Sequence, residues 1–579
     1  MRQRWVTTWV VTVLVATLAA APAPASASAP PEAEALPPAD VNGAARDGLS
    51  GDGTLRLGVG ALPTNWNPLH ADAPPSGVAD LLAPAMYTMW RFDTAGTPVL
   101  DTDYVLAVSE SGGTAPDPSA ASTPADSVPA DPAAGDGAPC ALPADPFTVT
   151  YTLNPEARWN DGSPITFADF AANWRALNGT DPAYDVASSA GYDRIGAVEQ
   201  GSDEREVVVR FCRPYADFEA LFLNLVPAAA VADPETFNAG WTSPNPDWLA
   251  GPFTVGGVDT DAGTFELVRN PSWWGATAML DGISFRVVDG GRAPQLLANG
   301  ELDSVAIGTD LNAYELAASI EGLAVRAAAG SDFRHLTVNM TAGGLAEQPV
   351  RQAIVLALDR AAIAAADLAG LPVPATRLDT RLAGATPPAE LAAPDPAAAA
   401  ALLDGAGWVL GDDGVRSKGD TPLAVTFSRV AGVRLSAIEA QLVAEQLGAV
   451  GFEVEIVDLP ADTWFDSVQA GEFELITFTW LGTPFPHRLA AQLYRADAPG
   501  SVAAAETDEI EALLEALQTE TDDTARAAVA GELDALLWQH AHTIPLFAVP
   551  DLVATRADLA NWGAFGRSSP VWQDVGFTS

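Results

Sequence analysis

The residue types that carry catalysis occur in this chain, but not in the spacings that catalysis requires. No GxSxG, Walker A, HExxH or strand-borne GxGxxG motif is present. Of the five histidines only His540 and His542 stand close together, and no third metal ligand is in view beside them. We interpret the pair as flanking a helix end and the surface, with a metal pair as the less favoured alternative. We therefore predict no catalytic residue, no metal ligand, no cofactor and no enzymatic activity.

The charge of the chain excludes one class of partner. It carries 75 Asp and Glu against 29 Lys and Arg, a formal net charge of −46. With so many carboxylates some close pair is inevitable, so paired acids of the glycosidase type carry no information here. A charge of this sign repels phosphate backbones and anionic lipids, and we predict no binding to nucleic acid. We interpret the acids as a solvated surface.

The N-terminal residues indicate export. Arg2 and Arg4 precede an apolar run over 5–21 and a string of small residues over 23–27, the pattern of a secretory signal peptide spanning 1–27. We expect cleavage near Ala27, with a retained anchor as the alternative, and an extracellular or cell-envelope location. Because no cysteine lies at this end, we expect no lipid-modified N-terminus from this start.

The two cysteines, Cys140 and Cys212, agree with export. They are the only two in the chain, and neither has a CxxC or metal-ligand spacing. In an oxidising compartment they predict one disulfide, with two unpaired thiols as the alternative.

Two low-complexity stretches lie among the elements of the first half. Residues 28–50 are predicted to be a flexible leader, and residues 111–145 a mobile surface insertion. Strands are expected over 55–59, 147–153 and 206–212, the last two as neighbours that bring the cysteines together. Between them the helix 166–177 has its apolar side chains at helical spacing, with Thr166 as N-cap and Asp169 at the capping-box position.

Helices and strands alternate after Pro349, which favours an α/β architecture. Helices are predicted over 350–365, 395–406, 437–450, 508–518 and 524–538, and strands over 423–427, 453–457, 475–480 and 544–547. The chain also has 16 Trp and 21 Phe, side chains that line concave ligand sites as well as cores.

Several segments, in order, resemble the extracellular solute-binding proteins of family 5, the peptide- and nickel-type receptors of ABC importers. The segments are YTLNPEARWNDGSPITFADF (151–170), GPF (251–253), LVRNPSWW (267–274), Asn339, VRQAIVLALDR (350–360), ALLDGAGW (401–408), DGVRSKG (413–419) and FELITFTW (473–480). Any one of them is weak, but in register over about 55–550 they are specific.

The resemblance implies an α/β, two-lobed periplasmic-binding-protein-like fold (type II, cluster C) with an extra small subdomain in lobe I. Lobe I would span 51–330 with the subdomain near 90–250, lobe II would span 331–543, and 544–579 would return to lobe I. It also implies a monomer that closes on a peptide or other small ligand and delivers it to an ABC importer permease.

One departure from the family concerns the loop after the strand 475–480. Peptide-binding members place there an Asp that pairs with the α-ammonium of the ligand, whereas this loop reads LGTPFP (481–486) and has Thr483 at that position. A hydroxyl cannot neutralise an ammonium, so Thr483 either alters ligand recognition or only shapes a turn, and the two readings weigh equally.

Five residues are candidates for the ligand site: Trp480 and Thr483, Trp66 and Asn67 after the first strand, and Asn339 near the hinge. Each has a structural alternative, strongest for Trp480 as packing within a lobe. The LGTPFP loop with DPAY (181–184) and GYDRI (191–195) resembles an actinobacterial branch that includes a mycobacterial lipoprotein linked to cell-wall glycolipid synthesis. A non-transport envelope role, binding or scaffolding glycolipid synthesis, is therefore the alternative function.

Overall fold

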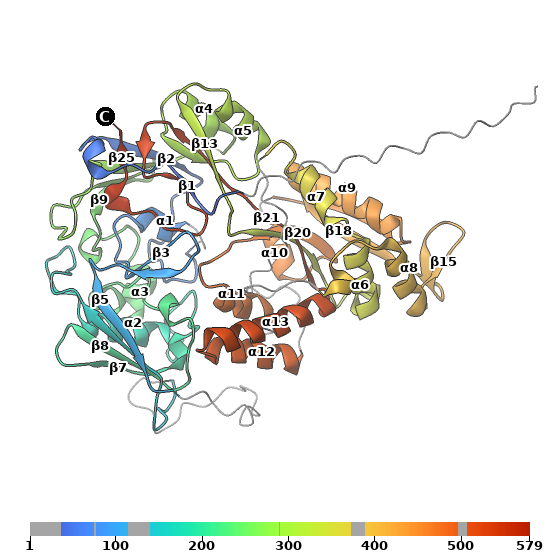
Figure 1. Ribbon diagram of the computed structural model, residues 1–579, viewed down its shortest axis with the longest axis horizontal. Helices are drawn as coiled ribbons and strands as arrows, with labels where there is room; N and C mark the ends of the chain where they lie inside the picture. Colours follow the sequence, from blue (N-terminus) through green and yellow to red (C-terminus); the bar gives the residue numbers. More distant parts are fainter. Residues whose placement is uncertain are drawn as a thin grey trace, which may run out of the picture.

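The computed structural model describes residues 36–73, 77–113, 139–288, 290–371, 388–461, 463–495 and 507–578. The chain forms two lobes joined near their middle, with lobe I on the left of Figure 1 and lobe II on the right. Both contain sheets and helices, so the predicted α/β class is confirmed. The predicted signal peptide and residues 114–138 of the predicted insertion lie outside the described residues.

Lobe I is built on a seven-stranded mixed sheet in the order β13-β22-β12-β2-β11-β10-β9. β2 runs parallel to β11 and β12, whereas β9, β10 and β11 form antiparallel pairs. In β10 the alternation of apolar and polar residues buries Phe265 and Leu267. The strands are β2 (Thr54–Val59), β9 (Phe253–Asp259), β10 (Thr264–Arg269), β11 (Gly282–Val287), β12 (Ser304–Ala306), β13 (Leu323–Ala328) and β22 (Asp551–Arg556).

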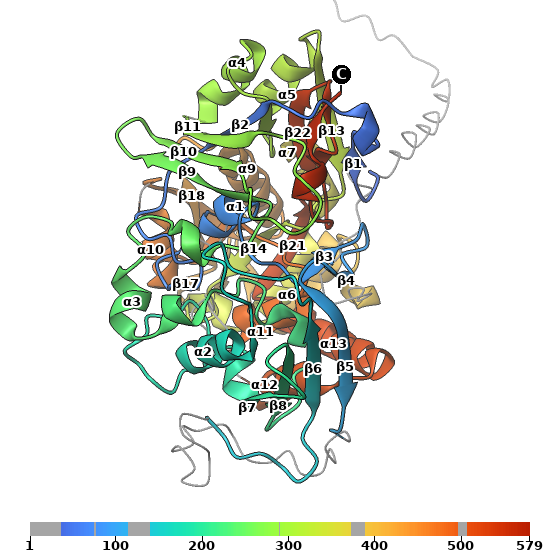
Figure 2. The same ribbon diagram turned by 90° about the vertical axis from the view of Figure 1, so that its left-hand side faces the viewer.

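A smaller antiparallel sheet, in the order β5-β6-β8-β7, forms the subdomain at the lower edge of lobe I (Figure 2). Its strands are β5 (Val105–Ser111), β6 (Thr148–Leu153), β7 (Ile195–Gln200) and β8 (Glu206–Phe211). Helix α2 (Phe167–Leu177) packs on the sheet through Phe170, and its capping box of Thr166 and Asp169 is present as predicted. A disulfide joins Cys140 to Cys212, with 6.1 Å between their Cα atoms.

Lobe II is built on a five-stranded sheet in the order β19-β18-β20-β14-β21. Every residue of β14, an interior strand between β20 and β21, is buried, because helices and loops cover both faces. The strands are β14 (Phe333–Val338), β18 (Ala424–Val430), β19 (Glu453–Leu459), β20 (Leu475–Trp480) and β21 (Thr543–Ala548). Helices α8 (Pro396–Gly405) and α9 (Arg434–Gly448) complete the predicted alternation.

The predicted single helix over 350–365 is wrong, because two helices occupy this stretch. Helix α6 (Gln348–Ala357) ends before Asp359, and α7 (Arg360–Asp367) begins after it. The Asp359 carboxylate accepts the Ala362 backbone N–H at 2.9 Å, and its own N–H donates to the Gln446 side chain at 2.7 Å. The apolar pattern continues through the break, but an Asp cap competes with helix continuation at this point.

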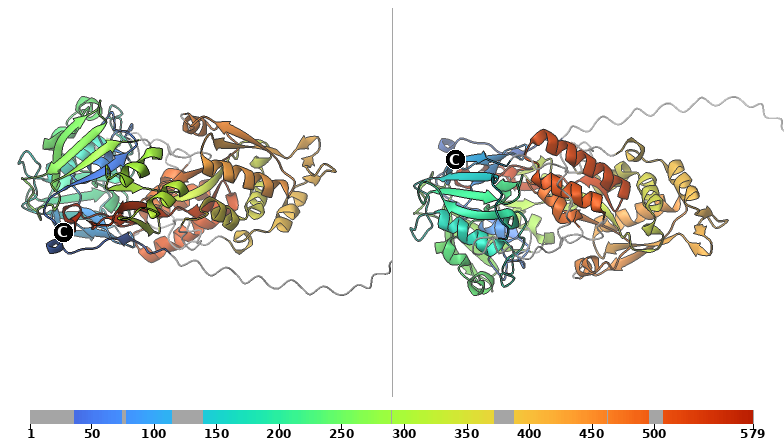
Figure 3. Two further views of the ribbon diagram at one scale, coloured as in Figure 1. Left: turned by 90° about the horizontal axis from the view of Figure 1, so that it is seen from above. Right: turned by 90° about the horizontal axis from the view of Figure 1, so that it is seen from below.

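Three further helices form a separate bundle with its own small apolar core. These are α11 (Pro486–Tyr494), α12 (Asp508–Thr519) and α13 (Asp523–His540), and the core includes Leu514, Leu517 and Leu533. Figure 3 shows α12 and α13, in red and orange, lying beside the four-stranded sheet when the molecule is seen from below. The bundle therefore spans from lobe II toward the subdomain of lobe I.

The chain crosses between the two large sheets twice. It leaves β13 for β14 through 329–332 and returns from β21 to β22 through 549–550. The resemblance placed residues 544–548 in the C-terminal segment that returns to lobe I. In the structure they pair with β14 in the five-stranded sheet of lobe II. The crossings lie side by side, because the Val549 backbone N–H donates to the Asp332 carbonyl at 2.9 Å.

The predicted flexible leader over 28–50 is wrong from residue 36 onward. β1 (Asp40–Val41) pairs with β24 (Gly563–Ala564). The Asp40 carboxylate binds Arg326 at 3.1 Å, and Arg46 pairs with Asp574. A composition rich in Ala and Pro does not reveal partners that lie hundreds of residues away.

The contact between the crossings gives a first prediction. A Cβ on Gly330 would lie 2.0 Å from the Val549 carbonyl oxygen, so Gly330→Ala must push the two segments apart. We expect a loss of roughly 1 to 3 kcal/mol in the free energy of unfolding, measured by denaturant titration. Gly448→Ala in α9, where nothing lies within 4 Å, is the matched control and should be neutral or stabilising. Equal stability of the Gly330 variant and wild type would show that the crossings are not tightly packed.

Candidate functional site

The loop that follows β20 lies where lobe II meets lobe I. Its Gly482 backbone N–H donates to the Asp332 carboxylate at 2.8 Å, which ties the loop to the first crossing. The Thr483 hydroxyl accepts the Phe485 backbone N–H at 3.0 Å. The hydroxyl of Thr483 is therefore used in shaping the turn at the start of α11.

Trp480, at the end of β20, packs within lobe II. Its ring is half-buried, lies nearly parallel to the His335 ring at 5.7 Å between centroids, and meets Phe478 edge-on at 5.0 Å. His335 is fully buried, and burial, with help from the neighbouring Arg334, holds its pKa well below the ordinary value. The neutral His335 ring stacked on the Trp480 ring is a packing contact within lobe II.

Two contacts join this loop to lobe I. Phe485 is buried, and its ring meets Phe92 of β3 (Trp90–Phe92) edge-on, with 5.6 Å between centroids. In the first turn of α11, Arg488 donates to the Ala220 carbonyl at 3.3 Å. An apolar anchor and a hydrogen bond therefore join the two lobes at this point.

The helix bundle makes a second, more polar junction with lobe I. Arg194 of the subdomain is 2% exposed and donates to Glu515 at 3.0 Å and to Gln518 at 2.9 Å on α12. Burial would raise the pKa of Glu515, but Arg194, Arg213 and Arg495 together outweigh it, and the pKa lies below its usual value. Arg526 of α13 pairs with the buried Asp217 of the subdomain.

A cavity of about 460 Å³ lies in lobe I, next to the first of these junctions. This volume is within the range of small-molecule sites, roughly 300–1,000 Å³. Phe92 forms part of its wall, so the residue that touches Phe485 of lobe II also faces the cavity. Aromatic side chains dominate the lining: Tyr87, Trp90, Phe92, Tyr104, Trp273, Phe285, Trp562 and Trp572.

Few charged groups line this cavity. Arg91 and Asp101 form an ion pair at 3.4 Å. Asp80 of helix α1 (Val78–Leu82) is exposed to solvent, yet the surrounding protein raises its pKa to about 6. An apolar site with a few convergent polar groups and a perturbed pKa is the usual form of a binding site.

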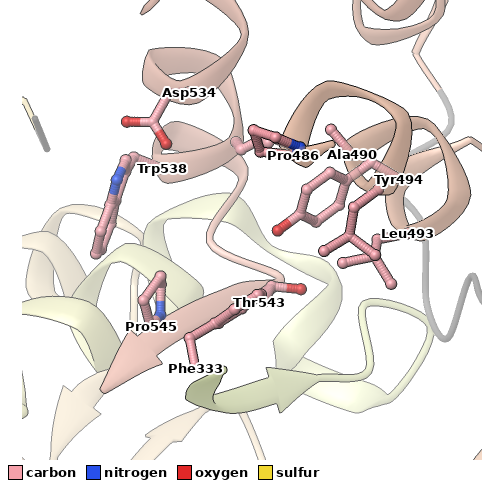
Figure 4. A pocket seen from close by; sticks show the side chains of 11 residues that line it. Phe333, Pro486, Ala490, Leu493, Tyr494, Asp534, Trp538, Thr543 and Pro545 are labelled. Atoms are coloured by element: carbon pink, nitrogen blue, oxygen red, sulfur yellow. The ribbon is translucent and has the colours of Figure 1, made fainter. Parts of the chain in front are cut away.

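A second pocket lies inside lobe II, between α11, α13 and the strands β14 and β21 (Figure 4). Phe333, Tyr494 and Trp538 converge on it, but its volume is only about 30 Å³. It holds little more than one water molecule. We therefore place the ligand site at the cavity of lobe I.

None of the five predicted site residues lines the cavity of lobe I. Trp66 is 1% exposed and packs on Phe265 at 4.7 Å between ring centroids. Asn67 is fully buried and donates to the Phe237 carbonyl at 2.9 Å, while Asn339 donates to the Phe473 carbonyl at 2.8 Å. Each of these amides also accepts a backbone N–H two residues further on, from Leu69 and Thr341, and so holds a turn.

The residues of the cavity and of its junction were missed in the sequence. Phe92 and Asp80 come from segments with no family motif, and Trp562 and Trp572 from the last 20 residues. The only signal was the high number of aromatic residues. Among the described residues no group of three His, Cys, Asp or Glu is placed to hold a metal ion, and no helix is both long and apolar enough to span a bilayer.

Comparison with known proteins identifies the fold and the relatives of this chain. Residues 141–500 match the model of the bacterial extracellular solute-binding proteins, family 5. The oligopeptide-binding protein OppA of Mycobacterium tuberculosis is 31% identical, over 93% of this chain and 87% of its own length. The probable monoacyl phosphatidylinositol tetramannoside-binding protein LpqW of the same organism is 31% identical over 37% of this chain and 33% of its own length.

Among solved structures, the periplasmic EDTA-binding protein EppA superimposes with a TM-score of 0.78 at 22% identity. The match covers 93% of this chain and 98% of that one. The predicted two-lobed periplasmic-binding-protein-like fold is therefore confirmed.

The contact of Phe485 with Phe92 gives a second prediction. Phe485→Ala removes the apolar anchor between the lobes, so we expect the open form to gain population and the radius of gyration from small-angle scattering to increase. Phe465→Ala on α10 (Trp464–Gln469), where the ring is 41% exposed, is the matched control and should leave the scattering unchanged. If both variants scatter like wild type, the Phe485 contact does not hold the lobes together.

Proposed function

Because the chain belongs to family 5 of the bacterial extracellular solute-binding proteins, we propose that it is the receptor of an ABC importer that binds oligopeptides or peptide-like ligands by hinge closure. Its partners in this role are the ligand and the importer permease, and it acts as an exported monomer. It binds a solute and does not transform it, so no catalytic residue is needed. Its charge of −46 opposes binding to nucleic acid.

The observation that carries the proposal is the position of the cavity. Its wall residue Phe92 touches Phe485 of lobe II, so a ligand in the cavity lies against the junction that closure must form. A ligand can favour the closed form only through contacts that differ between the open and closed states. All residues that line the cavity belong to lobe I, so the proposal requires that closure at this junction bring residues of lobe II against a bound ligand.

The chemistry of the lining favours an amphipathic ligand such as a peptide. Aromatic walls bind apolar side chains, and the polar residues Thr88, Asn224 and Gln573 supply hydrogen-bonding groups for amides. The loop 481–486 contains no acidic residue, and the Thr483 hydroxyl is already bonded to the backbone. The amino terminus of a peptide therefore cannot be neutralised by that loop.

A second candidate function is an envelope role in which the protein binds a cell-wall glycolipid. Two observations favour it: the similarity of part of the chain to LpqW, and the apolar, aromatic lining of the cavity. Both functions use the same cavity, and they differ in the ligand.

Thermal unfolding distinguishes the two functions. If the protein is a peptide receptor, pools of short peptides should raise its melting temperature as their concentration rises, with stabilisation of about 2.7 kcal/mol at a hundred times Kd. Phosphatidylinositol mannosides in detergent form the second arm, with detergent alone as the control. Stabilisation by the glycolipid and not by peptides would support the envelope role, and flat melting curves with both would contradict both functions.

A further inference from the structure

One charged side chain of the cavity has no partner. Among the described residues, no hydrogen bond or ion pair reaches the Asp80 carboxylate, although Asp80 lines the cavity. Helix α1 buries Val78, Leu81 and Leu82 on its other face. Asp80 and Ala79 are thereby left on the side that faces the cavity.

The other charges that line the cavity neutralise each other. Arg91 lies 3.4 Å from Asp101, which also accepts the Asp103 backbone N–H at 3.1 Å. Arg91 is the only Lys or Arg among the lining residues that the structure describes. Asp80 therefore gives the cavity an uncompensated negative charge when it is ionised.

The rings around the cavity favour a positive group as well. The faces of Trp, Tyr and Phe rings carry negative charge and attract cations within about 6 Å. Trp90, Trp273, Trp562 and Trp572 all contribute to the lining. An unpaired carboxylate in the same cavity as such rings is complementary to a cation carried on an apolar body.

We propose that Asp80 is the anionic partner of a primary ammonium group on the ligand, whose apolar part lies against the aromatic wall of the same cavity. This inference rests on the proposed solute-binding function. It assigns recognition of the positive charge to lobe I, whereas the loop 481–486 of lobe II carries no acid. The surrounding protein already disfavours an isolated carboxylate here and raises the pKa of Asp80 to about 6, a cost that an adjacent ammonium would offset.

A pair of small probes tests the proposal without knowledge of the natural ligand. We expect 2-phenylethylammonium to bind wild type at least tenfold more tightly than 2-phenylethanol, as measured by ligand-observed NMR. In Asp80→Asn this preference should disappear, because the amide cannot neutralise the ammonium. The control Asp261→Asn changes an exposed acid in the turn between β9 and β10 and should keep the preference. Circular dichroism and the melting temperature check that both variants fold.

The affinity of the ammonium probe should also depend on pH. Because the pKa of Asp80 is about 6, lowering the pH from 7.5 to 5 should weaken its binding to wild type about tenfold and leave the alcohol unchanged. The other titratable groups of the lining are Arg91, Asp101, Tyr87 and Tyr104. Burial raises the pKa of both tyrosines, so they stay protonated, and any pH dependence left in Asp80→Asn reports on Asp101.

Peptides then distinguish the source of the ammonium. A free amino terminus and a lysine side chain are separated by comparing a pentapeptide, its N-acetylated copy, and an N-acetylated copy with one internal lysine. Equal probe preference in Asp80→Asn and wild type overturns the role of Asp80 while the receptor function stands. Loss of the preference in Asp80→Asn without binding of any peptide supports the charge site and contradicts the peptide receptor.

Discussion

The spacing of two backbone segments, 329–332 and 549–550, is the constraint on which the rest of the structure depends. They are hydrogen-bonded to each other through Val549 and Asp332, and no side chain fits between them at Gly330. Asp332 also holds the loop after β20 through the Gly482 backbone N–H. The crossings are thus bonded to the loop that carries Phe485, which touches Phe92 of lobe I.

The two junctions between the lobes differ in chemistry, and both kinds of contact suit a reversible interface. The bundle meets the subdomain through ion pairs such as Arg194 with Glu515 and Arg526 with Asp217. Polar junctions of this kind resemble transient interfaces rather than cores. The cavity is lined mainly by apolar and aromatic residues, so a ligand that fills it removes apolar surface from water on closure.

Local sequence patterns predicted most helices and strands, but they could not predict contacts between residues far apart in the chain. The alternation in β8 was readable because it lies within the strand itself, and the capping box of α2 because Thr166 and Asp169 are close in the sequence. The helix break at Asp359 depends on Gln446, and the ordered structure that begins at residue 36 depends on Asp574. Both partners lie far along the chain. The buried ion pair of Arg334 and Glu439 joins β14 to α9. It could not be predicted either, because the sequence contains 75 acidic residues and nothing marks Glu439 among them.

The candidate site was harder to predict than the fold for the same reason. The position after the first strand led to Trp66 and Asn67, and a family motif led to Asn339, but their side chains pack or bond to backbone in this structure. The cavity draws its lining from segments near residues 80, 100, 223, 273 and 570, and of these only the segment near 273 belongs to a family motif. Only the folded chain brings them together.

The most direct test of hinge closure is an intramolecular distance. Spin labels at Asp261→Cys in lobe I and Val409→Cys in lobe II, both exposed, report the separation of the lobes by double electron–electron resonance. Closure predicts that saturating ligand shifts the distance distribution to one shorter, narrower population. A distribution that stays unchanged while calorimetry shows the ligand bound would contradict it.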